Sequence, residues 1–225
     1  MKSRYAEVYE QWRADPQAFW AQAATAIDWI SQPKRIFDAE AGVYGRWFPD
    51  ARVNACYNAL DRHVAAGRGD LAAILYDSPV TATQRRIGYA ELLAEVKTLA
   101  AVLQDFGVAA GDRVIVYMPM IPEAIVGMLA CARIGAVHSV VFGGFAAKEL
   151  ATRIDDAAPK LVLTASCGIE PGRVVAYKPL LDLAIAMSKH KPTATILFQR
   201  PQLAAPMNAE RDHDWTALVS AAAQS

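Results

Sequence analysis

The chain has 225 residues, of which 54% are apolar, and its 23 Lys and Arg residues are balanced by 23 Asp and Glu residues. This apolar content is enough for the core of one domain or two small ones. With no net charge, no overall field draws the chain to nucleic acid or to an anionic membrane. Four of the first ten residues are charged, where a signal peptide needs an apolar segment, and no apolar run is long enough to span a bilayer. We therefore expect a soluble, cytoplasmic globular chain without a nucleic-acid or membrane partner.

Residues 1–70 predict a helical, aromatic-rich N-terminal region. Two helical stretches lie between Tyr5 and Trp29, and they are separated at Asp15-Pro16, where Asp15 can cap the second helix. Residues 33–50 contain several helix and strand breakers and are expected to be irregular. Asn54 is then a candidate cap for a helix that continues through Val64.

Residues 71–225 predict an α/β subdomain, a parallel sheet with flanking helices. The segments 71–76 and 85–89 read as a hairpin around Ser78-Pro79. After the hairpin, short apolar strands alternate with helices, which is the pattern of a parallel sheet with right-handed crossovers. The expected strands are 114–118, 136–141, 160–164 and 194–198, and the expected helices are 92–106, a helix from Pro122 to Gly135, 147–156, 178–187 and 215–223.

A Gly-Gly turn, Phe142-Gly143-Gly144-Phe145, follows the second of these strands. Ligands of open α/β sheets bind beyond the carboxyl ends of the strands, and glycines there let backbone N–H groups approach a phosphate. The alternative is a tight turn that only redirects the chain. The spacing of two glycines leaves both interpretations open.

A second candidate segment, Cys167 to Arg173, follows the strand 160–164. An arginine in such a loop can bind a phosphate through two parallel N–H groups. The alternative is an arginine in contact with solvent only. Because the two strands are consecutive in the chain, we expect their loops to lie close together at one edge of the sheet.

The other polar residues do not indicate a catalytic or metal-binding site. His138 lies within an apolar strand and is expected to be a core histidine. The three cysteines, Cys56, Cys131 and Cys167, are far apart in the sequence and have no evident histidine partner, so buried thiols in a reducing compartment are expected. We assign no catalytic residue and no metal ligand.

Residues 117–145 and 165–179 resemble the AMP-forming acetyl- and propionyl-CoA synthetases of the adenylate-forming superfamily. The resemblance implies the first βαβ subdomain of that fold. It also implies that Phe142, Gly143, Gly144 and Arg173 border the groove for the nucleotide end of CoA. Glu170 stands where acetyl-CoA synthetases have the first arginine of an Arg-Ala-Gly-Arg segment. The sequence around it is closer to the propionyl-CoA synthetases, which favours propionate over acetate.

The same resemblance implies a parent enzyme that joins a short-chain carboxylate to CoA through an acyl-AMP, using ATP and Mg²⁺. The family's phosphate loop, which ends in Pro-Lys-Gly, occurs nowhere in the chain, nor do its later adenylation motifs. We therefore expect an N-terminal segment that lacks the ATP site, is inactive alone, and has the remaining C-terminal part of the enzyme as its partner. Two alternatives stay open, a free-standing CoA- or nucleotide-binding module and one half of a split ligase.

Overall fold

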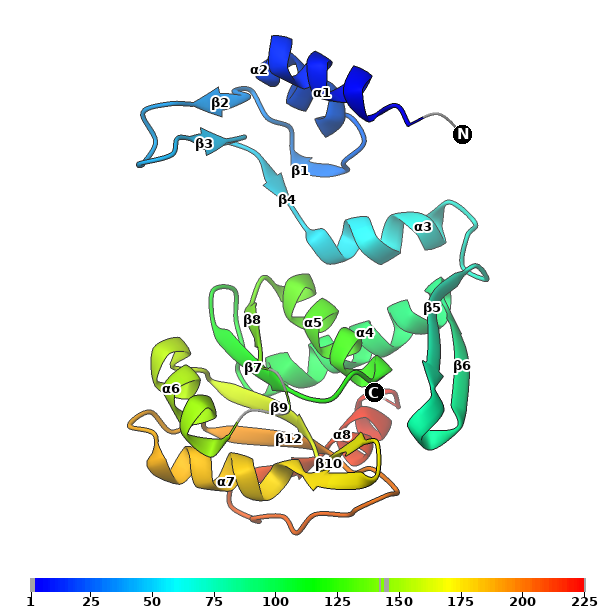
Figure 1. Ribbon diagram of the computed structural model, residues 1–225, viewed down its shortest axis with the longest axis vertical. Helices are drawn as coiled ribbons and strands as arrows, with labels where there is room; N and C mark the ends of the chain where they lie inside the picture. Colours follow the sequence, from blue (N-terminus) through cyan, green and yellow to red (C-terminus); the bar gives the residue numbers. More distant parts are fainter. Residues whose placement is uncertain (1–2, 142, 144–145, 225) are drawn as a thin grey trace. The chain divides into compact units, whose positions relative to one another are not determined.

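We describe a computed structural model of the chain, in which residues 3–141, 143 and 146–224 are placed well enough to describe. The chain divides into two compact units, residues 1–58 and 59–225 (Figure 1). Each unit is described by itself below.

The smaller unit begins with two helices, α1 (Tyr5–Ala14) and α2 (Pro16–Ala24). The Asp15 carboxylate accepts a hydrogen bond of 2.9 Å from the Ala18 N–H, which confirms Asp15 as the cap of the second helix. The region expected to be irregular contains an antiparallel pair, and a second pair brackets it. The pairs are β2 (Phe37–Asp38) with β3 (Arg46–Trp47), and β1 (Trp29–Ser31) with β4 (Arg52–Val53).

A short helical segment joins the two units. The Asn54 side chain accepts a hydrogen bond from the Tyr57 N–H at 2.9 Å, as a cap does, so the predicted helix start is confirmed. The first turn is π-helical, η1 (Tyr57–Asp61), and α3 (Arg62–Ala65) follows it. The predicted hairpin is also present, with β5 (Ala72–Ser78) antiparallel to β6 (Thr83–Gly88) around the 3₁₀ turn η2 (Pro79–Thr81).

A five-stranded parallel sheet forms the centre of the larger unit. Its strand order is β13-β12-β9-β7-β8, and the strands are β7 (Arg113–Tyr117), β8 (Val137–Val140), β9 (Leu161–Ala165), β12 (Ala194–Phe198) and β13 (Asp212–Asp214). Four of them were predicted. The fifth, β13, was not among the expected strands, and it pairs with β12 along its three residues.

The helices of this unit form two groups. One contains α4 (Tyr89–Asp105), α5 (Pro122–Ile134) and α8 (Trp215–Ala222), and the other contains α6 (Ala147–Ala157) and α7 (Tyr177–Met187). β8 lies on one side of β7 and β9 lies on its other side, so the chain changes direction across the sheet after β8. Because crossovers between parallel strands are right-handed, the helix that follows β8 lies on the opposite face of the sheet from the helix that precedes it. The two groups therefore cover the two faces (Figure 1).

The core of the larger unit lies where the central strands meet α6 and α7. Ile115 of β7, Val162 of β9 and Leu150 of α6 are fully buried. β9 is buried along its whole length, and β7 from Val114 onward, as expected for strands covered on both faces. His138 differs from the prediction, because β8 is an edge strand and leaves this side chain exposed.

The segment predicted as a loop, residues 168–173, forms most of a second hairpin. β10 (Cys167–Glu170) pairs antiparallel with β11 (Arg173–Ala176), and Gly172 has a left-handed backbone with φ +79° at the turn. Only glycine adopts this conformation without strain, which fixes the turn at Pro171-Gly172. The prediction of a loop was therefore wrong for these residues.

A buried ion cluster holds the edge strand β13 against α7. The Lys178 ammonium is 2.7 Å from an oxygen of Asp182 and 2.7 Å from Oδ2 of Asp212, and Arg211 pairs with both carboxylates. Burial raises the pKa of Asp212, but hydrogen bonds from Arg211 and Lys178 outweigh it, and the pKa falls below its usual value. Within the part of the chain that is described, no helix combines the length and the apolar character needed to cross a bilayer.

Candidate functional site

The candidate site is a groove at the carboxyl ends of the parallel strands. Its cavity is about 550 Å³, and the residues that line it come from the β5–β6 hairpin, the ends of β7, β8 and β12, and the β10–β11 hairpin. Two hairpins distant in sequence meet here, since the η2 turn contacts β10. A groove at this edge matches the position where ligands bind in open α/β sheets.

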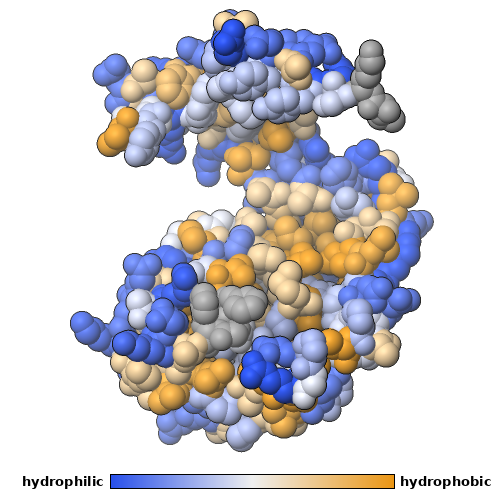
Figure 2. All heavy atoms as spheres, viewed as in Figure 1, coloured by the Kyte–Doolittle hydropathy of each residue, from blue (hydrophilic) through white to orange (hydrophobic). Residues whose placement is uncertain are grey.

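Much of the groove wall is apolar. Met120 is 89% exposed, and Val80 and Val140 are about half exposed. Figure 2 shows apolar residues gathered on the visible face of the larger unit, over β5 and α5. Apolar walls with a few polar groups are typical of ligand-binding clefts, in which the polar groups fix the ligand's orientation.

Gly143 is the residue of the Gly-Gly turn that the structure describes. It is buried, and a Cβ atom added to it would lie 2.0 Å from the Tyr177 hydroxyl oxygen. A Cβ atom added to Gly168 would lie 2.5 Å from the same oxygen. Two glycines from different segments thus leave room for one tyrosine ring, so close packing accounts for both. Phe142, Gly144 and Phe145 lie outside the described residues.

Tyr177 stacks on Tyr117, with ring centroids 5.0 Å apart and an interplanar angle of 29°. The Tyr117 hydroxyl donates a hydrogen bond of 3.3 Å to the Gly143 carbonyl. Burial and the neighbouring Tyr177 raise the pKa of Tyr117 to about 12, and burial followed by the charge of Glu170 raises the pKa of Tyr177. Both hydroxyls are therefore neutral at physiological pH and keep the proton that a hydrogen-bond donor needs, which Tyr117 uses for Gly143.

Arg173 lies at the tip of the β10–β11 hairpin, directly opposite Glu170. Its guanidinium is 2.6 Å from Glu170 Oε2, and the two side chains are 69% and 42% exposed. Arg173 lines a neighbouring hollow of about 320 Å³, whereas Glu170 lines both this hollow and the main groove. The predicted arginine is thus next to the groove, and an acidic neighbour already pairs with it.

The sequence analysis did not identify two polar residues that line the groove, Tyr177 and Arg200. Tyr177 begins a helix and Arg200 follows a strand, and no motif marks either residue. They reach one place because β9, β11 and β12 end there. The expectation that the loops after β8 and β9 emerge at one edge is confirmed by the parallel pairing, although β7 separates the two strands.

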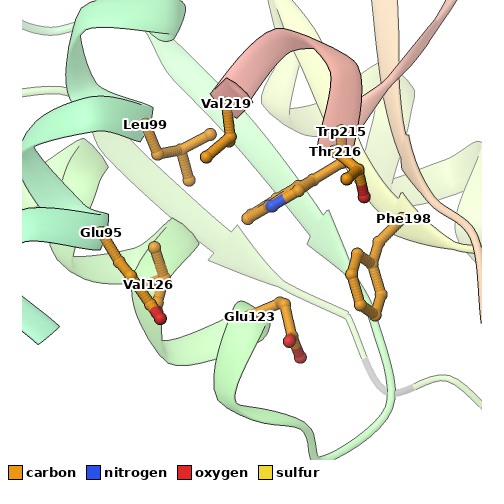
Figure 3. Close-up of a pocket in the computed structure, with 8 residues that line it drawn as sticks. All are labelled: Glu95, Leu99, Glu123, Val126, Phe198, Trp215, Thr216 and Val219. Atoms are coloured by element: carbon orange, nitrogen blue, oxygen red, sulfur yellow. The ribbon is translucent and has the colours of Figure 1, made fainter. Parts of the chain in front are cut away.

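A second, smaller cavity lies between α4, α5, α8 and the end of β12 (Figure 3). Its volume is about 180 Å³, and Phe198 and Trp215 face the carboxylates of Glu95 and Glu123 across it. Arg85 lies 3.9 Å from Glu95 and 3.7 Å from Glu123. Because both carboxylates already have a cationic partner, we assign this cavity to the packing of α8.

The cysteines contribute no reactive thiol to either cavity. Cys56, Cys131 and Cys167 are free thiols and fully buried, as predicted. Burial raises the pKa of Cys131 to about 12, which disfavours the thiolate that a nucleophile needs.

Comparison with known proteins defines the class. Residues 61–223 match the family described as AMP-binding enzyme, and residues 5–59 match the acetyl-coenzyme A synthetase N-terminus. The chain therefore belongs to the AMP-binding enzyme family.

Individual relatives show which AMP-binding enzymes the chain is similar to. The chain is 51% identical over 203 residues to the mitochondrial acyl-CoA synthetase short-chain family member 3 of Mus musculus, covering 90% of this chain and 30% of the relative. It is 42% identical over 214 residues to the propionate–CoA ligase of Escherichia coli, covering 95% and 34%. Among solved structures, an acetoacetyl-CoA synthetase from Streptomyces lividans matches with a TM-score of 0.85 and 26% identity, covering 97% of this chain and 33% of that one. The chain spans about a third of the length of these relatives, and the structural match confirms the predicted α/β fold.

Proposed function

We propose that the chain is the N-terminal segment of an AMP-forming short-chain acyl-CoA ligase, with propionate as the preferred acid. In this proposal a carboxylate displaces pyrophosphate from ATP to form an acyl-AMP, and the thiol of CoA then displaces AMP. The aromatic-rich region, residues 1–70, precedes an α/β subdomain, residues 71–225, that supplies scaffold and one wall of the CoA entrance. ATP, Mg²⁺ and the acid would be bound mainly by residues outside this chain, and the enzyme would be cytoplasmic.

The observation that carries this proposal is the groove at the carboxyl edge, bordered by Gly143 and flanked by Arg173. Phe142, Gly143, Gly144 and Arg173 remain our candidates for contacts with the nucleotide end of CoA. A guanidinium, aromatic side chains and glycines are together the groups that suit a purine that carries a phosphate. The Glu170–Arg173 pair is exposed, so a phosphate can compete with Glu170 for the guanidinium.

A chimera can test the proposal. This chain would replace the aligned N-terminal part of the Escherichia coli propionate–CoA ligase, to which it is 42% identical. Two reactions are measured separately, propionate-dependent exchange of pyrophosphate into ATP and formation of propionyl-CoA. We expect both activities in the chimera, and background exchange for the 225-residue chain alone.

Substitution of Arg173 in the chimera tests the CoA wall. Arg173→Ala removes a charge-assisted contact and should raise the apparent KM for CoA roughly tenfold, while pyrophosphate exchange stays nearly unchanged. Glu170→Gln removes the competing carboxylate and should lower that KM. Arg153→Ala, an exposed arginine on α6, serves as the matched control. If exchange collapsed in Arg173→Ala while the CoA dependence stayed the same, the CoA-wall assignment would be wrong.

The affinity of the 225-residue chain for CoA distinguishes a segment of a ligase from the alternative, a free-standing module. Such a module would bind CoA in the absence of any other segment with the affinity of a finished site. A segment of a ligase would bind it only weakly, because one wall is formed elsewhere.

A further inference from the structure

Arg200 is a buried cation at the floor of the groove. It is 8% exposed, and its Nη1 donates a hydrogen bond of 3.1 Å to the Cys167 carbonyl. Among the described residues, no carboxylate lies within ion-pair distance of its guanidinium. Burial of a charge without a counter-charge is costly, so an anion that entered the groove would be stabilised here.

Ser166 fixes the position of Arg200 from the backbone. The Ser166 hydroxyl accepts a hydrogen bond of 2.8 Å from the Arg200 N–H, and the Arg200 carbonyl accepts one of 3.3 Å from the Leu203 N–H. The bond to the Cys167 carbonyl holds the side chain as well. The guanidinium is therefore preorganised and loses little further freedom when it binds a ligand.

The same serine positions Tyr177. The Ser166 carbonyl accepts a hydrogen bond of 3.0 Å from the Tyr177 N–H, and the tyrosine ring is 6% exposed and lines the groove. Within the described part of the chain its hydroxyl has no hydrogen-bond partner. The hydroxyl can therefore donate a hydrogen bond to an acceptor on a ligand in the groove.

The acidic residues near the groove have other partners, so the charge of Arg200 is available to a ligand. Glu170 pairs with Arg173 at the hairpin tip, and Asp77 is exposed on β5 and accepts a hydrogen bond from Gln84 at 3.3 Å. Arg173 shares its charge with Glu170, whereas the Arg200 guanidinium has, among the described residues, only the neutral Cys167 carbonyl as its partner.

We propose that Arg200 and Tyr177 form an anion subsite that binds a phosphate group of the ligand in this groove. The guanidinium offers a planar fork of N–H groups to two phosphate oxygens, and the tyrosine hydroxyl donates to a third. A cavity of about 550 Å³ has room for the nucleotide that carries the phosphate. The subsite itself stands on the geometry above, and only the choice of CoA as the phosphate compound rests on the proposed function.

The experiment uses the 225-residue chain and three phosphate probes, pyrophosphate, AMP and CoA, with pantetheine as a probe that carries no phosphate. Affinities are measured by calorimetry or by NMR titration, and melting temperatures are recorded in parallel. R200Q should weaken binding of the phosphate compounds that occupy the groove roughly tenfold or more, and Y177F roughly two- to tenfold. Pantetheine binding should not change. R153Q is the control for general loss of positive charge.

If Arg200 had only a structural role, its hydrogen bond to the Cys167 carbonyl would serve to hold the β10–β11 hairpin next to the end of β12. R200K separates the two roles, because lysine keeps the charge but loses the fork. We expect R200K to retain the melting temperature and to bind phosphate probes severalfold more weakly. Should R200Q fail to fold, R200K and Y177F still test the subsite.

Four outcomes decide the inference. Unchanged phosphate affinity in R200K and Y177F overturns it, as does the absence of binding of every phosphate probe at millimolar concentration. CoA binding that depends on Arg173 but not on Arg200 also overturns it and leaves the proposed function standing. Arg200-dependent binding of pyrophosphate and AMP without binding of CoA supports the subsite and removes the CoA assignment.

Discussion

The packing of Tyr177 between two glycine backbones predicts a specific effect for Gly168→Ala. The added Cβ atom would lie 2.5 Å from the tyrosine oxygen and 2.6 Å from two ring carbons, whereas ordinary contacts begin at 3.4 Å. The ring would have to retreat by about 0.9 Å or the hairpin would have to move. Retreat is blocked, because the ring stacks on Tyr117, which is itself fully buried.

Overpacking of this kind costs roughly 1–3 kcal/mol. For a chain of about this size each kcal/mol lowers the melting temperature by about 2–4 °C, so we expect a decrease of roughly 2–12 °C. The free energy of unfolding is measured by urea titration with circular dichroism. The matched background is Tyr177→Leu, in which the atoms nearest to the new Cβ are absent.

A double-mutant cycle isolates the contact. If the ring is the obstacle, Gly168→Ala costs far less in the Tyr177→Leu background, and the coupling energy between the two sites is large. Equal costs in the two backgrounds would refute the argument that the tyrosine is the reason for glycine at position 168.

Two further predictions concern charged groups. Lys178→Met leaves the buried Asp212 with Arg211 as its remaining cation, so we expect a loss of about 3 kcal/mol in unfolding free energy, which Asp212→Asn in the same chain partly restores. No restoration by the second substitution would argue against the ion cluster as the cause. Burial raises the pKa of Glu95, with Arg85 opposing, so its contribution to stability is complete at acid pH and is lost as pH rises through the raised pKa. As pH rises above the unperturbed value of 4.5, the wild type should therefore lose unfolding free energy relative to Glu95→Gln, and a difference between the two that is constant with pH would contradict this.

Local signals in the sequence identify much of the fold. Pro122 begins α5, and Gly135, with φ +77°, ends it, as the sequence indicates. Asp15 and Asn54 act as caps for the same reason, since each places a side-chain oxygen within reach of a backbone N–H three residues later. Such features depend on neighbours along the chain, and a single sequence contains them.

The remaining features depend on residues that are distant in sequence. His138 lies in an apolar strand, but only the sheet order makes that strand an edge. Tyr177 and Arg200 meet because Ser166 binds the backbone of both. The ion pair of Glu170 with Arg173 depends on the hairpin register, which a loop prediction does not contain. The sequence thus predicted the edge of the sheet that carries the groove, but not the side chains of its floor.

The order of the strands also explains the position of Tyr177. β7 lies between β8 and β9, so the carboxyl ends of β8 and β9 are two strand spacings apart, about 10 Å. Gly143, after β8, and Gly168, after β9, nevertheless both reach the Tyr177 ring, because Cβ atoms added to them would lie 2.0 Å and 2.5 Å from its hydroxyl oxygen. One aromatic ring thus connects two segments whose strands are not neighbours, so a change at this single residue affects both of them.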